Sequence, residues 1–388
     1  MTRPVLEFVL PGSVDDPASP SGGNTYGRRV ATELGALGWP VERRLVPGGW
    51  PHPDAAAEAG LARVLATVPD GGVVLLDGLV AACVPQVVVP HAERLRLVVL
   101  VHLPLADEAG LRADVAADLD AKERATLRAA AAVVVPSAST AARLADHGLS
   151  AVHVAEPGTD RAPRSPGTDG ASALLCVAAV TPVKAHDVLV DALACAADEA
   201  WTCVCAGPLD RAPDHVARLR ERIEQAGLGD RVRLVGPLDG PALDAAYAAA
   251  DLAVLASTTE TYGMAAAEAL ARGIPMITTT GGALPDTVGH APDGTRPALL
   301  VAPRDAAAFA AALRRWCAEP ALRARLRAAA VARGATLPGW DATAVAVSAA
   351  LEGALAGGPV AAADRGRVSS PRLGRSGATL LPDREGTP

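Results

Sequence analysis

Short runs of aliphatic and β-branched residues alternate with helical stretches rich in Ala, Leu and Arg along most of this 388-residue chain. The first runs are Val5–Leu10, Val73–Leu76, Leu97–Val101, Ala132–Val135 and Val152–Ala155. A continuous apolar strand followed by a helix is typical of parallel βαβ units, whose strands are covered on both faces. The pattern therefore predicts an α/β fold built on parallel sheets.

The alternation stops at a cluster of Pro, Gly, Ser and Asp over residues 161–170 and then starts again. Six further strands are predicted, at Ala173–Val177, Thr202–Ala206, Val232–Val235, Leu252–Leu255, Pro275–Thr279 and Ala298–Val301. An aperiodic cluster of turn-forming residues is typical of a linker. We predict two doubly wound domains, residues 1–165 and 166–340, a final helix at 341–356 that crosses back to the first domain, and a disordered tail at 357–388.

Composition narrows the class of partner. Aromatic residues make up 3% of the chain and the formal net charge is −7. A chain with few aromatic side chains and a net negative charge is poorly suited to stacking on bases or to binding a polyanion. We expect no nucleic-acid partner.

The cysteines and the apolar runs indicate the cellular compartment in which we expect the protein. The six cysteines contain no Cys-x-x-Cys pair, and the first ten residues include Glu7. Apolar runs such as Leu97–Leu103 are much shorter than the roughly 20 residues of a membrane helix. We expect a cytoplasmic protein with reduced thiols and no transmembrane segment, with peripheral membrane contact left open. Cys203 and Cys205 lie on one face of a predicted strand, which indicates packing rather than metal ligation.

Two glutamates, Glu260 and Glu268, flank a predicted helix start that follows the strand Leu252–Leu255. Open α/β sheets bind ligands at the carboxyl ends of their strands, and a helix N-terminus presents unpaired N–H groups that suit phosphate. The donors here are the N–H groups of Gly263, Met264 and Ala265. The segment predicts separate contacts for a sugar, a phosphate and a second polyol.

Two motifs in the first half of the chain also follow directly after predicted strands. Gly22-Gly23-Asn24 precedes a predicted helix at Thr25–Leu37 and follows the first strand. His102 follows the strand Leu97–Val101 and comes two residues before Pro104. Both motifs are therefore expected at the ligand-binding edge of the first sheet.

Glu, seven residues and Glu in this setting resembles the signature of the retaining GT-B glycosyltransferases of family 4. Gly281–Asp286 is similar to that family's glycine-pair loop, with Asp where Glu is usual, and Gly22–Asn24 is similar to its N-terminal loop. His102 matches its donor-site histidine, and Pro157–Asp160 resembles the stretch that closes its first domain. The resemblance covers roughly residues 4–355. It implies a GT-B fold, in which two Rossmann-like domains face each other across a cleft.

The resemblance also implies an activity: transfer of a sugar, with retention of anomeric configuration, from a nucleotide-diphosphate sugar to an acceptor hydroxyl. No metal or other cofactor is implied, and the acceptor is left open among small molecules, glycans and lipid-linked molecules. The implied catalytic residues are His102, Lys184 and Glu260, with Glu260 on the donor sugar. The implied donor-binding residues are Gly22, Gly23, Asn24, Gly263, Met264, Ala265 and Glu268, with Glu268 on the ribose.

One position departs from the family pattern. The family grips the diphosphate with an Arg and, five residues later, a Lys; here the Lys is Lys184 but the Arg position is Ala179. The four residues between them are uncharged, so none of their side chains replaces the missing cation. Backbone N–H groups of Gly22, Gly23 and Gly263 are candidates to supply part of that stabilisation.

Other hypotheses remain beside this one. A non-catalytic GT-B protein that binds a nucleotide sugar, and another GT-B enzyme such as a sugar-nucleotide epimerase, are the alternatives. Asp118-Leu119-Asp120 is similar to the metal-binding Asp-x-Asp of a different glycosyltransferase fold. It lies within a predicted helical stretch, Gly110–Ala131, rather than at a strand end, so we do not expect it to bind a metal.

Overall fold

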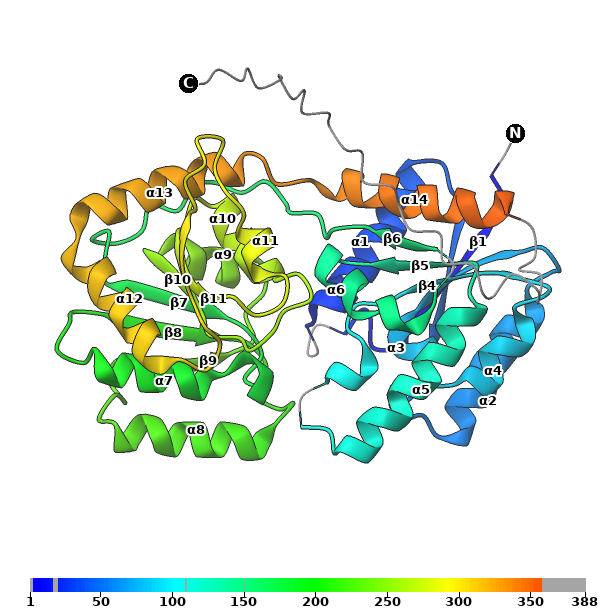
Figure 1. Ribbon diagram of the computed structural model, residues 1–388, viewed down its shortest axis with the longest axis horizontal. Coiled ribbons are helices and arrows are strands. Elements are labelled where there is room, and N and C mark those ends of the chain that lie inside the picture. The colour runs from blue at the N-terminus through cyan, green and yellow to red at the C-terminus, as the bar shows by residue number, and fades with distance from the viewer. Residues whose placement is uncertain (1–2, 17–19, 109, 150, 358–388) are drawn as a thin grey trace, which may run out of the picture.

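The computed structural model describes residues 3–16, 20–108, 110–149 and 151–357. These residues form two α/β units side by side, coloured blue to cyan and green to gold in Figure 1. Each unit contains a six-stranded sheet, and every strand pair in both sheets is parallel. We call the two units the first and second domains. The α/β prediction is confirmed.

The first sheet has the order β2-β1-β3-β4-β5-β6. Its strands are β1 (Leu6–Pro11), β2 (Val41–Val46), β3 (Val73–Asp77), β4 (Arg96–Leu100), β5 (Ala132–Val135) and β6 (Val152–Val154). The intervening helices are α1 (Gly22–Ala36), α2 (Ala55–Thr67), α3 (Gly78–Ala81), α4 (Pro85–Val88), η1 (Val89–His91), η2 (Leu105–Asp107), α5 (Ala113–Ala129), α6 (Ala138–Arg143) and η3 (Ala145–His147). The strand order reverses between β1 and β3, which opens a crevice at their carboxyl ends.

The second sheet has the order β12-β11-β10-β7-β8-β9. Its strands are β7 (Ala173–Val177), β8 (Thr202–Ala206), β9 (Val232–Gly236), β10 (Leu252–Leu255), β11 (Met276–Thr279) and β12 (Ala298–Val301). The remaining helices are η4 (Pro182–Lys184), α7 (His186–Cys195), α8 (Pro213–Gln225), α9 (Gly240–Ala248), α10 (Met264–Ala271), α11 (Leu284–Val288), α12 (Ala306–Ala318), α13 (Pro320–Gly334) and α14 (Trp340–Ala356). The reversal here lies between β7 and β10, the two strands that precede Lys184 and Glu260.

The last helix, α14, returns to the first domain, as Figure 1 shows. Its buried residues Val347 and Leu351 pack in the same apolar cluster as Leu6 and Phe8 of β1. The two chain segments that cross between the domains touch each other, since a Cβ on Gly158 would lie only 2.3 Å from the backbone nitrogen of Trp340. A glycine at 158 therefore permits this close approach.

The structure adds one strand to the predicted elements and moves the start of one helix. Strand β2 was not predicted, because its sequence Val-Glu-Arg-Arg-Leu-Val lacks an apolar run. It is an edge strand whose four central residues are exposed to solvent. Helix α1 begins at Gly22 and not at Thr25, because the Ser21 side chain accepts a hydrogen bond from the Asn24 backbone nitrogen at 3.0 Å. Ser21 is thus an N-cap, and the two glycines form the first turn of the helix.

From residue 358 onward the predicted tail lies outside the described residues. Within the part of the chain that the structure describes, no helix combines the length and apolar character needed to cross a membrane.

Candidate active site between the two domains

A cavity of about 400 Å³ lies between the domains and is lined by residues from both. Its first-domain wall includes Gly22, Gly23, Tyr26 and His102. Its second-domain wall includes Ala179, Lys184, Arg211, Glu260, Gly263, Met264, Ala265 and Glu268. The structure thus gathers every predicted site residue except Asn24 around one cavity of a size typical for small-molecule sites.

Lys184 and Glu260 face each other across the loops that follow β7 and β10. The Lys184 Nζ atom lies 2.6 Å from Glu260 Oε1, and Ser257 Oγ donates to the same oxygen at 2.7 Å. Both charged side chains are largely shielded from water, with 25% and 13% of their surfaces exposed. This ion pair fixes both groups at the carboxyl edge of the second sheet.

The glycine pair Gly281-Gly282 explains why Glu260 lies where it does. A Cβ on Gly282 would be 2.2 Å from the Glu260 carbonyl oxygen, and Gly282 also has a positive φ of 61°. The backbone nitrogen of Ala283 donates to that same carbonyl at 2.8 Å. The glycine loop therefore holds the backbone of Glu260, which positions its carboxylate.

Helix α10 starts directly on the cavity wall. Its N-cap is Gly263, with φ 95° and ψ 58°, a left-handed conformation that side chains disfavour. A Cβ there would also lie 2.9 Å from Leu284 Cδ2. The first N–H groups of a helix have no intrahelical acceptor, so Met264 and Ala265 present donors to the cavity.

Glu268 lies further along α10 and is partly buried. Burial raises the pKa of its carboxyl group, and the Tyr247 hydroxyl donates to Oε2 at 2.9 Å. The guanidinium of Arg272 lies over the Tyr247 ring at 4.3 Å from its centroid. Tyr247 is thus held on one side of the carboxylate, which retains further lone pairs for a ligand.

On the first-domain wall, His102 is oriented by a residue that the sequence did not single out. His102 Nε2 lies 3.2 Å from Oδ2 of Asp77, and the other carboxylate oxygen of Asp77 accepts from the Leu79 nitrogen at 2.8 Å. The Tyr26 ring packs edge-on against the imidazole with 5.3 Å between centroids. A signal for Asp77 existed: it is the acid that ends the apolar run Val73–Leu76 just before Gly78.

Asn24 lies away from the cavity wall. Its residue surface is 8% exposed, and its side-chain amide donates to the Ser13 carbonyl at 3.3 Å. Its backbone N–H is taken by the Ser21 hydroxyl. The predicted donor contact of Asn24 thus gains no geometric support, whereas Gly22 and Gly23 lie on the wall.

The sequence analysis also missed Arg211, which lies on the loop between β8 and α8 and lines the cavity. Its Nη2 atom donates to the Pro20 carbonyl oxygen at 2.5 Å, across the gap between the domains. The sequence gives no signal for this arginine. The phosphate-binding pattern lies on the loop that carries Ala179 and Lys184, whereas Arg211 lies on the next loop.

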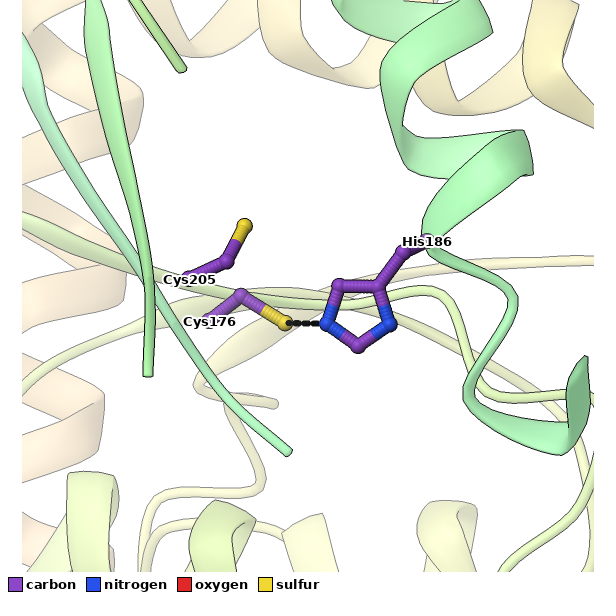
Figure 2. A group of neighbouring side chains, drawn as sticks. All are labelled: Cys176, His186 and Cys205. Atoms are coloured by element: carbon purple, nitrogen blue, oxygen red, sulfur yellow. Dashed lines mark hydrogen bonds between the residues drawn. The ribbon is translucent and has the colours of Figure 1, made fainter. Parts of the chain in front are cut away.

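The predicted pair Asp118 and Asp120, and a buried group of two cysteines and a histidine, have the chemistry of metal ligands, and all of them lie outside the cavity lining. Asp118 and Asp120 are on helix α5, where they pair with Lys122 and Arg124, each at 2.7 Å. The other group, Cys176, His186 and Cys205, is buried in the second domain, and its ligand atoms lie within 4.8 Å of one another. Figure 2 shows this group between neighbouring strands and the start of α7. The distance from Cys176 Sγ to His186 Nε2 is 3.6 Å. The hydrogen bond with Cys205 and burial raise the pKa of the Cys176 thiol well above its usual range, as suits a cysteine that packs as an apolar group.

Comparison with known proteins gives a family match within the second half of the chain. Residues 160–333 match the model of the family described as glycosyl transferases group 1. A D-inositol 3-phosphate glycosyltransferase of Thermomonospora curvata is 37% identical over 194 residues, which are 48% of this chain and 44% of that protein. One from Salinispora arenicola is 34% identical over 225 residues, 52% of this chain and 48% of that protein. The chain spans about half the length of the curated relatives it matches.

Solved structures extend the likeness to both domains at the level of the fold. Sucrose-phosphate synthase from Thermosynechococcus elongatus superposes with a TM-score of 0.74 at 22% identity, covering 91% of this chain and 100% of that one. Anabaena HepE, solved in complex with UDP and glucose, gives a TM-score of 0.68 at 20% identity and covers 89% of this chain and 99% of that one. These likenesses confirm the two-domain GT-B architecture, and residues 160–333 are similar to the group 1 glycosyltransferases.

Proposed function

We propose that this chain is a retaining glycosyltransferase that moves a sugar from a nucleotide-diphosphate sugar to an acceptor hydroxyl without a metal ion. The observation that carries the proposal is the order of groups on the second-domain wall. Glu260, Lys184, the start of α10 and Glu268 border one cavity. A sugar, a diphosphate and a ribose need the same kinds of group: a carboxylate, a cation with N–H donors, and a second carboxylate.

The diphosphate binds between Lys184 and the first turn of α10. The ammonium group and the free N–H groups of Met264 and Ala265 are suited to phosphate oxygens, and the helix dipole adds to their field. As the bond to the sugar breaks, negative charge builds on the diphosphate, so donors fixed in advance stabilise the transition state more than the bound donor.

The two carboxylates have separate partners. Glu260 accepts hydrogen bonds from hydroxyl groups of the transferred sugar and at the same time holds Lys184 in place, at 2.6 Å. Glu268 accepts from the neighbouring hydroxyls of the ribose, a pair that one carboxylate can bind with both oxygens.

The acceptor approaches from the first domain. Its hydroxyl oxygen forms a bond to the anomeric carbon on the face from which the diphosphate leaves, and the carbon–oxygen bond to that diphosphate breaks. The acceptor proton passes to a phosphate oxygen of the leaving group, so the configuration is retained without a protein nucleophile. His102, oriented by Asp77, contacts the donor near its reacting carbon.

The relatives guide the choice of first substrates, because HepE was solved with UDP and glucose and the curated relatives are named for D-inositol 3-phosphate. We would screen UDP-, GDP- and ADP-sugars by thermal shift, since a ligand at 100 times its Kd stabilises the fold by about 2.7 kcal/mol. Transfer to hydroxyl acceptors, inositol phosphates among them, is then followed by NMR of the anomeric proton.

The NMR assay separates this proposal from its alternatives. An α-linked product from an α-linked donor is expected. An inverted product contradicts retention, and a changed sugar nucleotide without acceptor indicates an epimerase. Binding without turnover across the panel indicates a non-catalytic protein, the alternative that the alanine at position 179 leaves open.

A further inference from the structure

The cavity is short of positive charge for the ligand proposed above. Among the described residues that line it, Lys184 and Arg211 are the two with permanently cationic side chains. Lys184 already pairs with Glu260 at 2.6 Å, so its charge is largely compensated before a ligand binds. A diphosphate that gains charge during the reaction therefore requires a second cation, and position 179, an alanine on the wall, supplies none.

Arg211 comes from the loop next to the one that carries Ala179. The strands β7 and β8 are neighbours, and their following segments stay joined, because the Val180 nitrogen donates to the Pro208 carbonyl at 2.9 Å. A Cβ on Gly207 would lie 2.0 Å from the Ala178 carbonyl oxygen, so only a glycine permits this contact. The structure thus holds the base of the Arg211 loop against the segment Ala178–Val180.

The guanidinium of Arg211 also reaches the first domain at a position suited to an anion. It donates to the Pro20 carbonyl, one residue before Ser21, the N-cap of α1. Gly22 and Gly23, the first residues of that helix, lie on the same cavity wall. Among the described residues Arg211 forms no ion pair, and the one carbonyl uses only part of its five N–H donors.

We propose that Arg211 supplies the second cation of the diphosphate site, in place of the side chain that is missing at position 179. When the nucleotide sugar binds, the guanidinium contacts phosphate oxygens opposite Lys184, with the start of α1 beside it. A planar guanidinium binds two phosphate oxygens at once, which a distant point charge does not. This inference rests on the proposed function, since it presumes that a nucleoside diphosphate occupies the cavity.

The experiment measures by calorimetry the affinity for UDP, GDP and ADP. It then measures the affinity for the nucleoside that corresponds to the diphosphate that binds most tightly. Arg211→Ala is expected to weaken diphosphate binding by about tenfold, the size of one charged hydrogen bond, and to leave nucleoside binding unchanged. Arg220→Ala is the matched control, because Arg220 is an exposed arginine on α8 outside the cavity lining. It should bind like the parent.

A second variant separates a phosphate contact from a latch between the domains. In the Arg211→Ala background, Ala179→Arg restores a cation to the family position and should recover most of the lost affinity. If Arg211 only links the two domains through its contact with Pro20, an arginine at position 179 would not restore the affinity. Parent-like diphosphate affinity in Arg211→Ala, equal loss of diphosphate and nucleoside affinity, or absence of rescue would each overturn the role of Arg211. A parent that binds none of the three diphosphates overturns the proposed function as well, which distinguishes the two failures.

Discussion

The two walls of the cavity are built from different chemistry. The second-domain wall carries Lys184, Arg211, Glu260 and Glu268, whereas the described part of the first-domain wall offers His102, Tyr26 and the glycine turn that starts α1. The match to group 1 glycosyltransferases covers residues 160–333, which is the second domain. Charged groups on this wall suit the nucleotide-sugar donor that we propose.

The first-domain wall is suited to a different task. Its histidine is oriented by a buried carboxylate, Asp77, and by the edge of Tyr26 rather than by a basic cluster. A wall with few charged side chains discriminates between acceptors by shape and hydrogen bonding. We therefore expect substitutions on the second-domain wall to change donor binding and the chemical step most, and those on the first-domain wall to act mainly on turnover.

The largest effect is expected from Lys184→Ala. Loss of a fixed cation from a leaving diphosphate should lower kcat by about 10²–10³-fold, the range for removing a major donor at a developing anion. The measurement is steady-state transfer with the best donor found. Lys122→Ala is the matched control, because the chain's other lysine lies on α5 and pairs with Asp118 away from the cavity. Equal activity of both variants would contradict a diphosphate role for Lys184.

The next largest effect is expected from Glu268→Gln, on binding rather than on chemistry. Loss of the charged acceptor for the ribose should weaken nucleoside diphosphate binding by about tenfold or more in calorimetry. Glu260→Ala is the contrast: its sugar partner is absent from the diphosphate, and its removal frees Lys184, so affinity should equal or exceed that of the parent. Weaker diphosphate binding in both variants would contradict the division of labour.

The same variant gives a pH test. Because burial raises the pKa of Glu268, its carboxyl group takes up a proton at a higher pH than an exposed glutamate. Parent affinity should therefore fall as the pH drops toward and below that raised pKa, and Glu268→Gln should lack this fall. Comparing the two at each pH removes the titration of the ligand itself. Parallel curves would show that Glu268 does not bind the nucleotide in its charged form.

The sequence predicted more residues of the second-domain wall than of the first, although it missed Arg211. Strands such as Leu252–Leu255 are continuous apolar runs, and the glycines and acids after them follow at short, fixed spacing, so local pattern locates them. β2 was missed because an edge strand with Glu42, Arg43 and Arg44 has no apolar run. Element starts also depend on single caps, as Ser21 shows for α1.

Side chains that meet only through the tertiary fold could not be predicted. Asp77 reaches His102 from a strand 25 residues earlier, and Arg211 reaches Pro20 across 191 residues. Tyr247 is joined to Glu268 in the same way, through α9 packing near α10. Asp77 is recognisable as an acid at the end of an apolar run, but in none of these pairs does the local sequence indicate which partner the side chain will meet. The contact arises where two strand or helix ends meet, which depends on sheet order.

A smaller effect is expected on the first-domain wall, from Asp77→Asn. The imidazole loses a charged partner for Nε2, which should lower kcat by about tenfold while KM for the donor stays nearly constant. Asp54→Asn is the matched control, because Asp54 also caps a helix, accepting from the Ala57 nitrogen at 2.8 Å, and lies outside the cavity lining. A raised KM with unchanged kcat would place His102 in binding alone. Equal losses of melting temperature and activity in both variants would indicate a folding effect.

The last prediction is that EDTA has no effect on turnover. Lys184 and Arg211 from one wall and the helix N-termini from both supply positive potential at the diphosphate, which is the role a divalent ion plays in metal-dependent transferases. Turnover should therefore be equal with EDTA and with added Mg²⁺ or Mn²⁺.

If EDTA lowers turnover, two further variants locate the ion. Asp118→Asn together with Asp120→Asn should then copy the loss if the helical acids bind it, although their pairing with Lys122 and Arg124 argues against that. Cys205→Ser should copy it, together with a lower melting temperature, if the buried cysteine and histidine group binds a structural ion. A loss copied by neither would place a metal in the cavity itself and would contradict the metal-independent mechanism, because the charge now assigned to Lys184 and Arg211 would then come from an ion.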